Sequence, residues 1–208
     1  PAMSGGLNYD EKVSFIAARL LSVTHDILWD MFSKKPVAPS YLAKLLQLGT
    51  PGKPLQIFTL NYDSALEDAF AKIKTYNGFK NYQWNPLDFS NPSYKVLIHH
   101  LHGATSWHEK KPLWGDSLIL GTTRKLTPWE LPQFLYLRFR EAIKQANLLC
   151  VIGYGWGDYY INTPIRERMK TAKLKEFRVM NISISTPADS KELKFSNKFQ
   201  NLYMPAKE

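Results

Sequence analysis

The chain has 208 residues, a formal net charge of +9 at neutral pH and a single cysteine, Cys150. One cysteine excludes an intrachain disulfide and any zinc site built from several cysteines. The apolar run around Cys150 is far shorter than the ~20 residues that span a bilayer, and no charged-then-apolar leader opens the chain, so we expect a cytoplasmic protein that does not contact a membrane. The positive charge favours anionic partners such as nucleotide phosphates or nucleic acid, although the lysines are scattered and form no dense patch.

The chain opens with helical patterns. Apolar residues recur at spacings of three and four over residues 9–33, which predicts one long amphipathic helix. Pro36 and Pro39 end this helix, and a shorter helix is predicted over residues 41–48. The glycine- and proline-rich segment GTPGKP then separates these helices from the rest of the chain.

Short apolar runs of the buried-strand type alternate with helical patterns in the remainder. Strands are predicted over residues 55–60, 95–103, 147–155 and 177–183, and helices over 63–73, over 128–146 and from about Asp158. Residues 75–94 are expected to be an irregular excursion over the surface, 106–124 a small hairpin or strap, and the tail from Ser190 a last helix. Apolar strands that alternate with helices indicate a parallel sheet covered on both faces. We therefore predict one α/β domain over residues 1–208, with a Rossmann-like, doubly wound and mostly parallel sheet.

Polar residues and glycines stand where the predicted strands end. Asn61 and Asp63 follow the first strand, His102 and Gly103 end the second, and the glycine-rich run from residue 153 to 157 ends the third. Ligands of such sheets bind beyond the carboxyl ends of the strands. Each feature also has a purely structural interpretation, because Asp63 can cap the next helix and the glycines can relieve crowding in a turn.

The second strand holds three histidines within four positions. Period-two geometry places His100 and His102 on one face and His99 on the other. A zinc site from His100, His102 and His108 is conceivable, but no acidic partner is evident nearby, so no metal is predicted. His102 is the better candidate for a catalytic base, because it stands at the strand end and imidazole titrates near ~6.5. We interpret His99 and His100 as strand residues without a catalytic role.

Four segments together resemble the SIR2-like family, the NAD-using relatives of sirtuins found in bacterial defence proteins. They are TLNYD, HLHGATSW, VIGYGWGD and VMNIS, in that order along the chain. The resemblance implies a Rossmann-like sheet that binds NAD. It also implies that Asn61 orients the attacking group at the nicotinamide ribose, that Asp63 lies near the nicotinamide carboxamide, and that His102 acts as a base through the ribose hydroxyls.

The resemblance assigns further residues to cofactor binding. Gly153, Tyr154 and Gly155 match a turn near the phosphate and ribose, and Asn181 matches the residue that holds the adenosine ribose. Thr59 and Gly103, from the first two segments, complete the expected cofactor-binding set.

Two departures from the family bear on function. The deacylases of the family carry a zinc module built on four cysteines, which this chain cannot supply. The family's first strand and glycine-rich loop are not recognisable before Tyr9, and residues 1–6 look like a cloning scar or a cut point. Either the chain is a fragment that lacks this strand and loop, or it is a divergent member with impaired NAD binding.

The leading hypothesis is therefore a NAD⁺ hydrolase that cleaves the nicotinamide–ribose bond as part of a bacterial defence system, with NAD as substrate and no metal. A non-catalytic module that binds NAD or ADP-ribose is the alternative. A NAD-dependent protein deacylase and a nucleic-acid-associated domain are weaker alternatives. A second copy of the chain, or an effector domain on a longer chain, is a further candidate partner.

Overall fold

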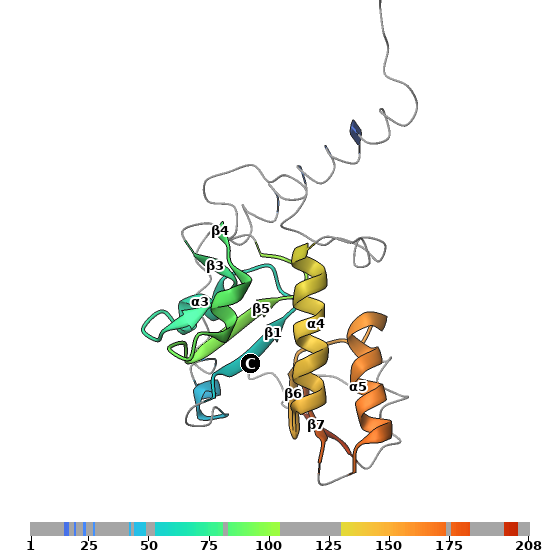
Figure 1. The fold of residues 1–208 in the computed structure, drawn as a ribbon. Helices are drawn as coiled ribbons and strands as arrows, with labels where there is room; N and C mark the ends of the chain where they lie inside the picture. The colour runs from blue at the N-terminus through green and yellow to red at the C-terminus, as the bar shows by residue number, and fades with distance from the viewer. Residues whose placement is uncertain are drawn as a thin grey trace, which may run out of the picture. The chain divides into compact units, whose positions relative to one another are not determined.

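The structure is a computed structural model that describes residues 44–48, 53–80, 83–104, 130–173, 176–183 and 198–203, with a few isolated positions before residue 44 (Figure 1). Contacts divide the chain into two compact units, residues 1–136 and 137–208. The five described positions within the predicted helix of residues 9–33 are helical, and the rest of that helix lies outside the described residues. The predicted strap of residues 106–124 also lies outside them.

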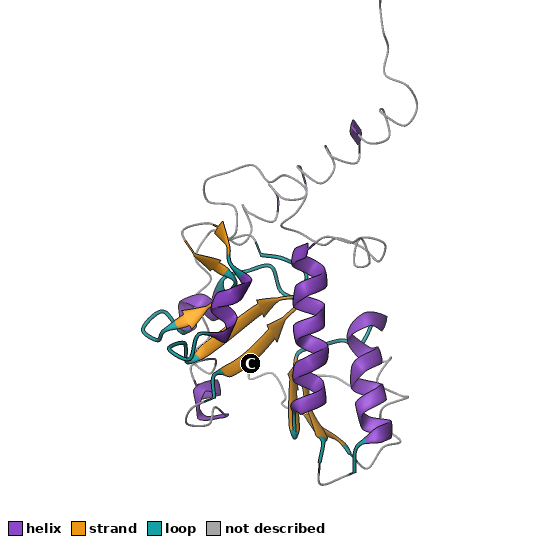
Figure 2. Cartoon of the chain, viewed as in Figure 1, coloured by secondary structure: helices purple, strands orange, loops and turns teal. Residues whose placement is uncertain are grey.

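The first unit is built on a parallel sheet. Its order is β1 (Leu55–Thr59), β5 (Val96–His100) and β2 (Thr75–Tyr76). Figure 2 shows β1 and β5 running side by side. All five residues of β5 are buried, because strands pair with it on both edges and its apolar side chains pack beside Phe70 of the segment behind β1. The short helix α3 (Ala65–Ala69) connects β1 to Phe70.

The segment of residues 75–94 corrects one expectation. It is not an irregular surface excursion, because it contributes β2, the antiparallel pair β3 (Phe79–Lys80) and β4 (Gln83–Trp84), and the 3-10 helix η2 (Pro86–Ser90). Tyr76 and Phe89 are buried and meet edge to face, with ring centroids 5.0 Å apart. Its aromatic side chains therefore fold it against the sheet. A second 3-10 helix, η1 (Lys44–Leu48), occupies most of the predicted helix at residues 41–48.

The second unit also contains a parallel sheet, in the order β6 (Leu148–Ile152), β7 (Arg178–Ser183) and β8 (Phe199–Tyr203). Helix α4 (Glu130–Gln145) leads into β6, and α5 (Tyr159–Thr171) connects β6 to β7. The expected helix in the tail is wrong for its described part, because residues 199–203 pair with β7 as a strand. The ring of Phe199 also packs edge to face on Trp156, with centroids 5.5 Å apart, which holds the strand against the sheet.

Parallel strands joined by helices confirm the predicted Rossmann-like α/β class in both units. The strand positions predicted from apolar runs agree with β1, β5, β6 and β7 to within a few residues. Among the described helices, none is both long and apolar enough to cross a membrane.

Candidate functional site

The polar residues predicted after the first two strands leave the same edge of the first sheet. The register of β1 and β5 pairs Thr59 with His100, and the Leu101 N–H donates to the Thr59 carbonyl oxygen at 2.9 Å. Asn61 and His102 each lie two residues beyond this pair. The rings of Tyr62 and His102 stand 6.4 Å apart between centroids. The tertiary structure therefore brings the Asn61 segment and the His102 turn to one edge of the sheet.

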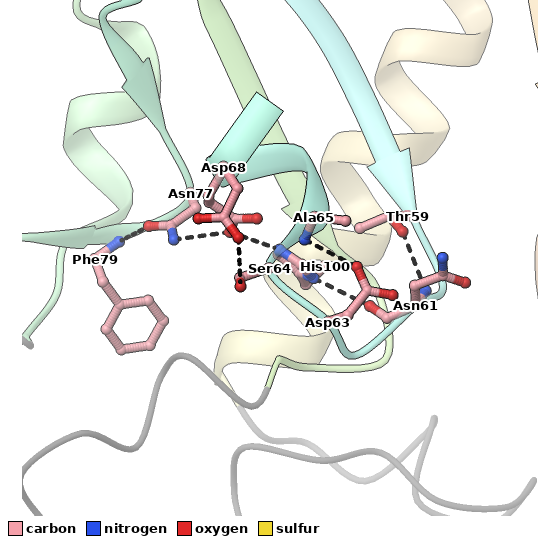
Figure 3. A network of polar contacts seen from close by, with 10 residues as sticks. Thr59, Asn61, Asp63, Ser64, Ala65, Asp68, Asn77, Phe79 and His100 are labelled. Atoms are coloured by element: carbon pink, nitrogen blue, oxygen red, sulfur yellow. Dashed lines mark hydrogen bonds and ion pairs between the residues drawn. The ribbon is translucent and has the colours of Figure 1, made fainter. Parts of the chain in front are cut away.

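Side chains, rather than secondary structure, hold the segment that carries Asn61. Its main-chain N–H donates to Oγ1 of Thr59 at 3.1 Å, and its carbonyl oxygen lies 3.1 Å from Nδ1 of His100. The side-chain amide of Asn61 is exposed and points away from the His100 ring (Figure 3). Both main-chain groups of Asn61 are thus bound, and its amide faces outward.

Asp63 lies two residues before α3, whose N-cap position is Ser64. Its Oδ1 accepts a hydrogen bond from the Ala65 N–H at 2.9 Å, which satisfies one of the free donors at the start of α3 (Figure 3). The side chain of Asp63 therefore assists the start of α3 from the position before the N-cap, and its proposed contact with the nicotinamide carboxamide stays a prediction.

His100 has both ring nitrogens on oxygen acceptors, and its side chain is fully buried. Nδ1 faces the Asn61 carbonyl, and Nε2 lies 2.8 Å from Oε1 of Glu67 in α3. The same Oε1 accepts a hydrogen bond from Nδ2 of Asn77 at 3.1 Å. His100 therefore connects β5, the β1–α3 segment and α3.

The electrostatics favour an ion pair between His100 and Glu67. Burial alone would lower the pKa of His100, but the charge of Glu67, hydrogen bonds to Glu67 and to the Asn61 carbonyl, and the charge of Asp63 raise it above the usual value. Burial alone would raise the pKa of Glu67, yet the charge and hydrogen bond of His100 and the Asn77 amide lower it. The two shifts have the signs that an imidazolium–carboxylate pair requires.

His99 and His102 occupy different surroundings from His100. The ring of His99 is buried and stacked between Phe58 and Phe89, with centroid distances of 4.4 and 4.5 Å. His102 lies in the turn after β5 and is partly exposed. The described residues contain no group of three or more histidine, cysteine, aspartate or glutamate side chains that could hold a metal ion, and His108 lies outside those residues.

Gly103 follows His102 with a φ of 89°, a left-handed conformation that glycine adopts without steric conflict. Its N–H donates to the His100 carbonyl at 3.1 Å and closes the turn at the end of β5. The glycine after the candidate base is therefore required by the turn itself, whether or not it also contacts a cofactor.

The two glycines predicted to approach a phosphate lie in the second unit, directly after β6. Gly153 has a φ of 66°, and Gly155 has no positive φ. A Cβ atom built at either position would meet no described atom within 4 Å. Gly153 thus has a conformational reason to be glycine, whereas the described structure gives Gly155 neither a conformational nor a packing reason.

The turn beyond these glycines is organised around Trp156, which is buried with a φ of 63°. The positive φ strains a bulky residue. The Trp156 indole Nε1 donates to Oδ1 of the buried Asn181 at 3.2 Å, and Nδ2 of Asn162 donates to the Trp156 carbonyl at 2.6 Å. The carboxamide oxygen of Asn181 thus accepts from an indole within the unit, and its predicted contact with the adenosine ribose stays untested.

Tyr154 and Asp158 complete this turn. The Tyr154 hydroxyl donates to Oδ1 of Asn162 at 3.0 Å and accepts from the Asp158 N–H at 3.1 Å. Oδ1 of Asp158 accepts from the Tyr160 N–H at 3.0 Å, which confirms Asp158 as the cap of α5. Hydrogen bonds within the second unit therefore hold this part of the glycine-rich turn in place.

Comparison with known protein families decides the relationship. Residues 55–202, more than half of the chain, match the model of a family described as the SIR2-like domain. The chain belongs to the SIR2-like domain family. A search of curated proteins finds no significant match.

Membership of the SIR2-like family confirms the resemblance carried by the four sequence segments, all of which lie within the matched range. The family is NAD-related, and its members are in general NAD-dependent enzymes. The sequence interpretation did not include Glu67 among the site residues and treated His100 as a plain strand residue. The available signal was the residue types: a carboxylate in α3, and an imidazole two residues before the candidate base His102.

Proposed function

We propose that this SIR2-like chain is a NAD⁺ hydrolase that cleaves the bond between nicotinamide and ribose. The observation that carries the proposal is the Thr59–His100 pairing, from which Asn61 and His102 both emerge at one edge of the sheet. An exposed amide and a partly exposed imidazole on these two segments supply the two groups that hydrolysis of an N-glycosidic bond needs: one to hold a water and one to take its proton.

The proposed reaction balances with water alone. The C1′–N bond breaks and its electron pair leaves with nicotinamide, which converts a charged pyridinium into a neutral base. The oxygen of a water held by the Asn61 amide forms the new bond to C1′, and His102 accepts the proton. The products are nicotinamide, ADP-ribose and one proton. No metal takes part in these steps.

Two further groups enter the proposal as binding groups, each within its own unit. In the first unit the carboxylate of Asp63 would hold the nicotinamide carboxamide. In the second unit the resemblance assigns phosphate binding to the turn at Gly153 and Gly155. Among the described residues no atom lies within 4 Å of a Cβ position at either glycine, which supports this, because a phosphate can approach a backbone only where no side chain intervenes. A role in bacterial defence follows from the resemblance alone and stays a prediction.

The experiment is to incubate the purified chain with NAD and to measure nicotinamide and ADP-ribose by chromatography. Turnover is expected in the wild type and should be lost in His102→Ala, with circular dichroism used to show that the variant is folded. Unchanged turnover in a folded His102→Ala variant would contradict the mechanism. If calorimetry shows that NAD binds and no product forms, the chain is a non-catalytic nucleotide-binding module and not a hydrolase.

A further inference from the structure

The contacts of His100 have a consequence for the Asn61 amide. A main-chain carbonyl oxygen can only accept a hydrogen bond, so the nitrogen that faces Asn61, Nδ1, must carry a proton if the 3.1 Å contact is a hydrogen bond. The other nitrogen, Nε2, shares a proton with the Glu67 carboxyl group at 2.8 Å. Whichever partner carries that shared proton, Nδ1–H remains directed at Asn61.

The Asn61 carbonyl that faces His100 belongs to the peptide group on the C-terminal side of Asn61. The N–H on the other side of the same residue is held by Thr59 at 3.1 Å. Rotation of the main chain about Asn61 is therefore restrained from both sides. The side-chain amide of Asn61 takes no part in this restraint, and the restrained main chain fixes the direction in which the side chain leaves it (Figure 3).

We propose that His100 is a positioning residue, whose Nδ1–H fixes the Asn61 carbonyl and thereby aims the Asn61 amide, with Glu67 holding the imidazole in place. The proposal rests on the hydrolase function proposed above and names a further residue for it. His100 does not touch substrate. It acts through Asn61, across 39 residues of chain, and Glu67 acts through His100 across 33.

The chain supplies a matched control on the same strand. His99 is the neighbour of His100 in β5 and is equally buried, but its ring is stacked between two phenylalanines rather than directed at the Asn61 segment. Phenylalanine at position 99 keeps a flat ring in that stack. His99→Phe is therefore expected to leave kcat and KM for NAD unchanged.

The test compares four folded variants in the nicotinamide-release assay. His100→Phe should lower kcat by about 10- to 100-fold with little change in KM, because a misaimed group mainly affects the chemical step. If that variant does not fold, the double variant Glu67→Leu/His100→Phe removes both charged groups together and should show the same loss. Glu67→Gln should keep most of kcat, because its amide N–H can donate to Nε2 and leave Nδ1 as the N–H that faces Asn61. Wild-type kcat in a folded variant without His100, or an equal loss in Glu67→Gln and His100→Phe, would overturn the proposal.

A second measurement separates this proposal from the proposed function. The ¹³C resonance of the Asn61 main-chain carbonyl reports its hydrogen bond directly. It should shift in His100→Phe, or in the double variant, and not in His99→Phe. If the wild type releases no nicotinamide, the hydrolase proposal fails, while this resonance still decides whether His100 holds Asn61. An unshifted resonance would overturn the positioning role.

Discussion

His100 and Glu67 are 33 residues apart in the chain and lie 2.8 Å apart between Nε2 and Oε1. The contact joins the central strand β5 to α3, a helix of five residues with no buried residue of its own. A helix this short is not stable in isolation. Its position depends on Phe70 in the core behind it and on the Glu67–His100 pair, so the pair serves both the fold and the candidate site.

Breaking the pair from one side is expected to destabilise the protein. Glu67→Leu removes the counter-charge that raises the pKa of the fully buried His100 imidazole and takes away the partner of its Nε2, which should lower the free energy of unfolding by about 3 kcal/mol. The double variant Glu67→Leu/His100→Phe should recover most of this loss, because no buried charge is left unpaired. Urea unfolding gives the free energy of unfolding of the wild type, of Glu67→Leu and of the double variant. Breaking the exposed Glu141–Lys144 pair with Lys144→Ala is the control and should have little effect.

The stability contributed by the pair should depend on pH with a definite sign. The pKa of His100 is raised above 6.5, so its contribution is complete below pH 6.5 and is lost as the pH rises through the raised value. The pKa of Glu67 is lowered below 4.5, so its contribution is complete above pH 4.5 and is lost as the pH falls through the lowered value. The difference in unfolding free energy between the wild type and the double variant should therefore be greatest between pH 4.5 and 6.5.

Asp63 also faces His100 and contributes to its raised pKa, so Asp63→Asn is the control for this pH series. Asp63→Asn should lower the pH at which the stability contribution of His100 is lost. It should not change the pH at which the contribution of Glu67 is lost. A stability difference between the wild type and the double variant that does not change with pH would show that the pair is not ionised.

Asn61→Ala is expected to separate chemistry from folding. The hydrogen bonds at this residue are made by its main-chain N–H and carbonyl groups, which alanine retains. The melting temperature should therefore stay close to that of the wild type, while kcat for nicotinamide release should fall by about 100-fold, because the water is no longer held in line. A large loss of stability in Asn61→Ala would mean that the side chain has a structural role.

The two glycines after β6 should respond differently to alanine. Gly153→Ala forces a side chain onto a φ of 66° and should destabilise the protein by about 1 kcal/mol. Gly155→Ala meets open space at an ordinary φ and should leave stability unchanged. If the turn receives the pyrophosphate, Gly155→Ala should nevertheless weaken NAD binding in calorimetry. Unchanged binding in Gly155→Ala would argue against a phosphate at this turn.

Trp156→Phe tests the centre of the second unit's turn. Phenylalanine keeps a ring against Phe199 but removes the indole N–H that binds the buried Asn181. Loss of one partner by a buried polar group should lower the free energy of unfolding by about 1–2 kcal/mol. Thermal and urea unfolding measure the change, and Tyr159→Phe, at a strongly exposed position, is the control that should show little effect.

Much of the fold could be predicted because it depends on local patterns. Four apolar runs located β1, β5, β6 and β7, and the start of α5 was predicted near Asp158, which caps that helix. Asn61 and His102 were predicted to lie close together from a general property of parallel sheets, and the Thr59–His100 register brings their segments to one edge. These features follow from side-chain periodicity and from which backbone groups a helix leaves unpaired.

The remaining features were decided by contacts between segments that are not adjacent in the chain. The composition of residues 75–94 is typical of a surface loop, but Phe89 of this segment stacks on the buried His99. Residues 199–203 form a strand because they pair with β7 at the edge of its sheet. The sequence by itself determined the family, the parallel strands and the polar residues at their ends. Only the tertiary structure decided that one histidine is stacked in the core, that the next holds Glu67 and the Asn61 carbonyl, and that the third lies in the turn at the sheet edge. The physical reason is that the alternation of a strand assigns a side chain to a face, whereas the partner it meets there comes from a segment more than 30 residues away.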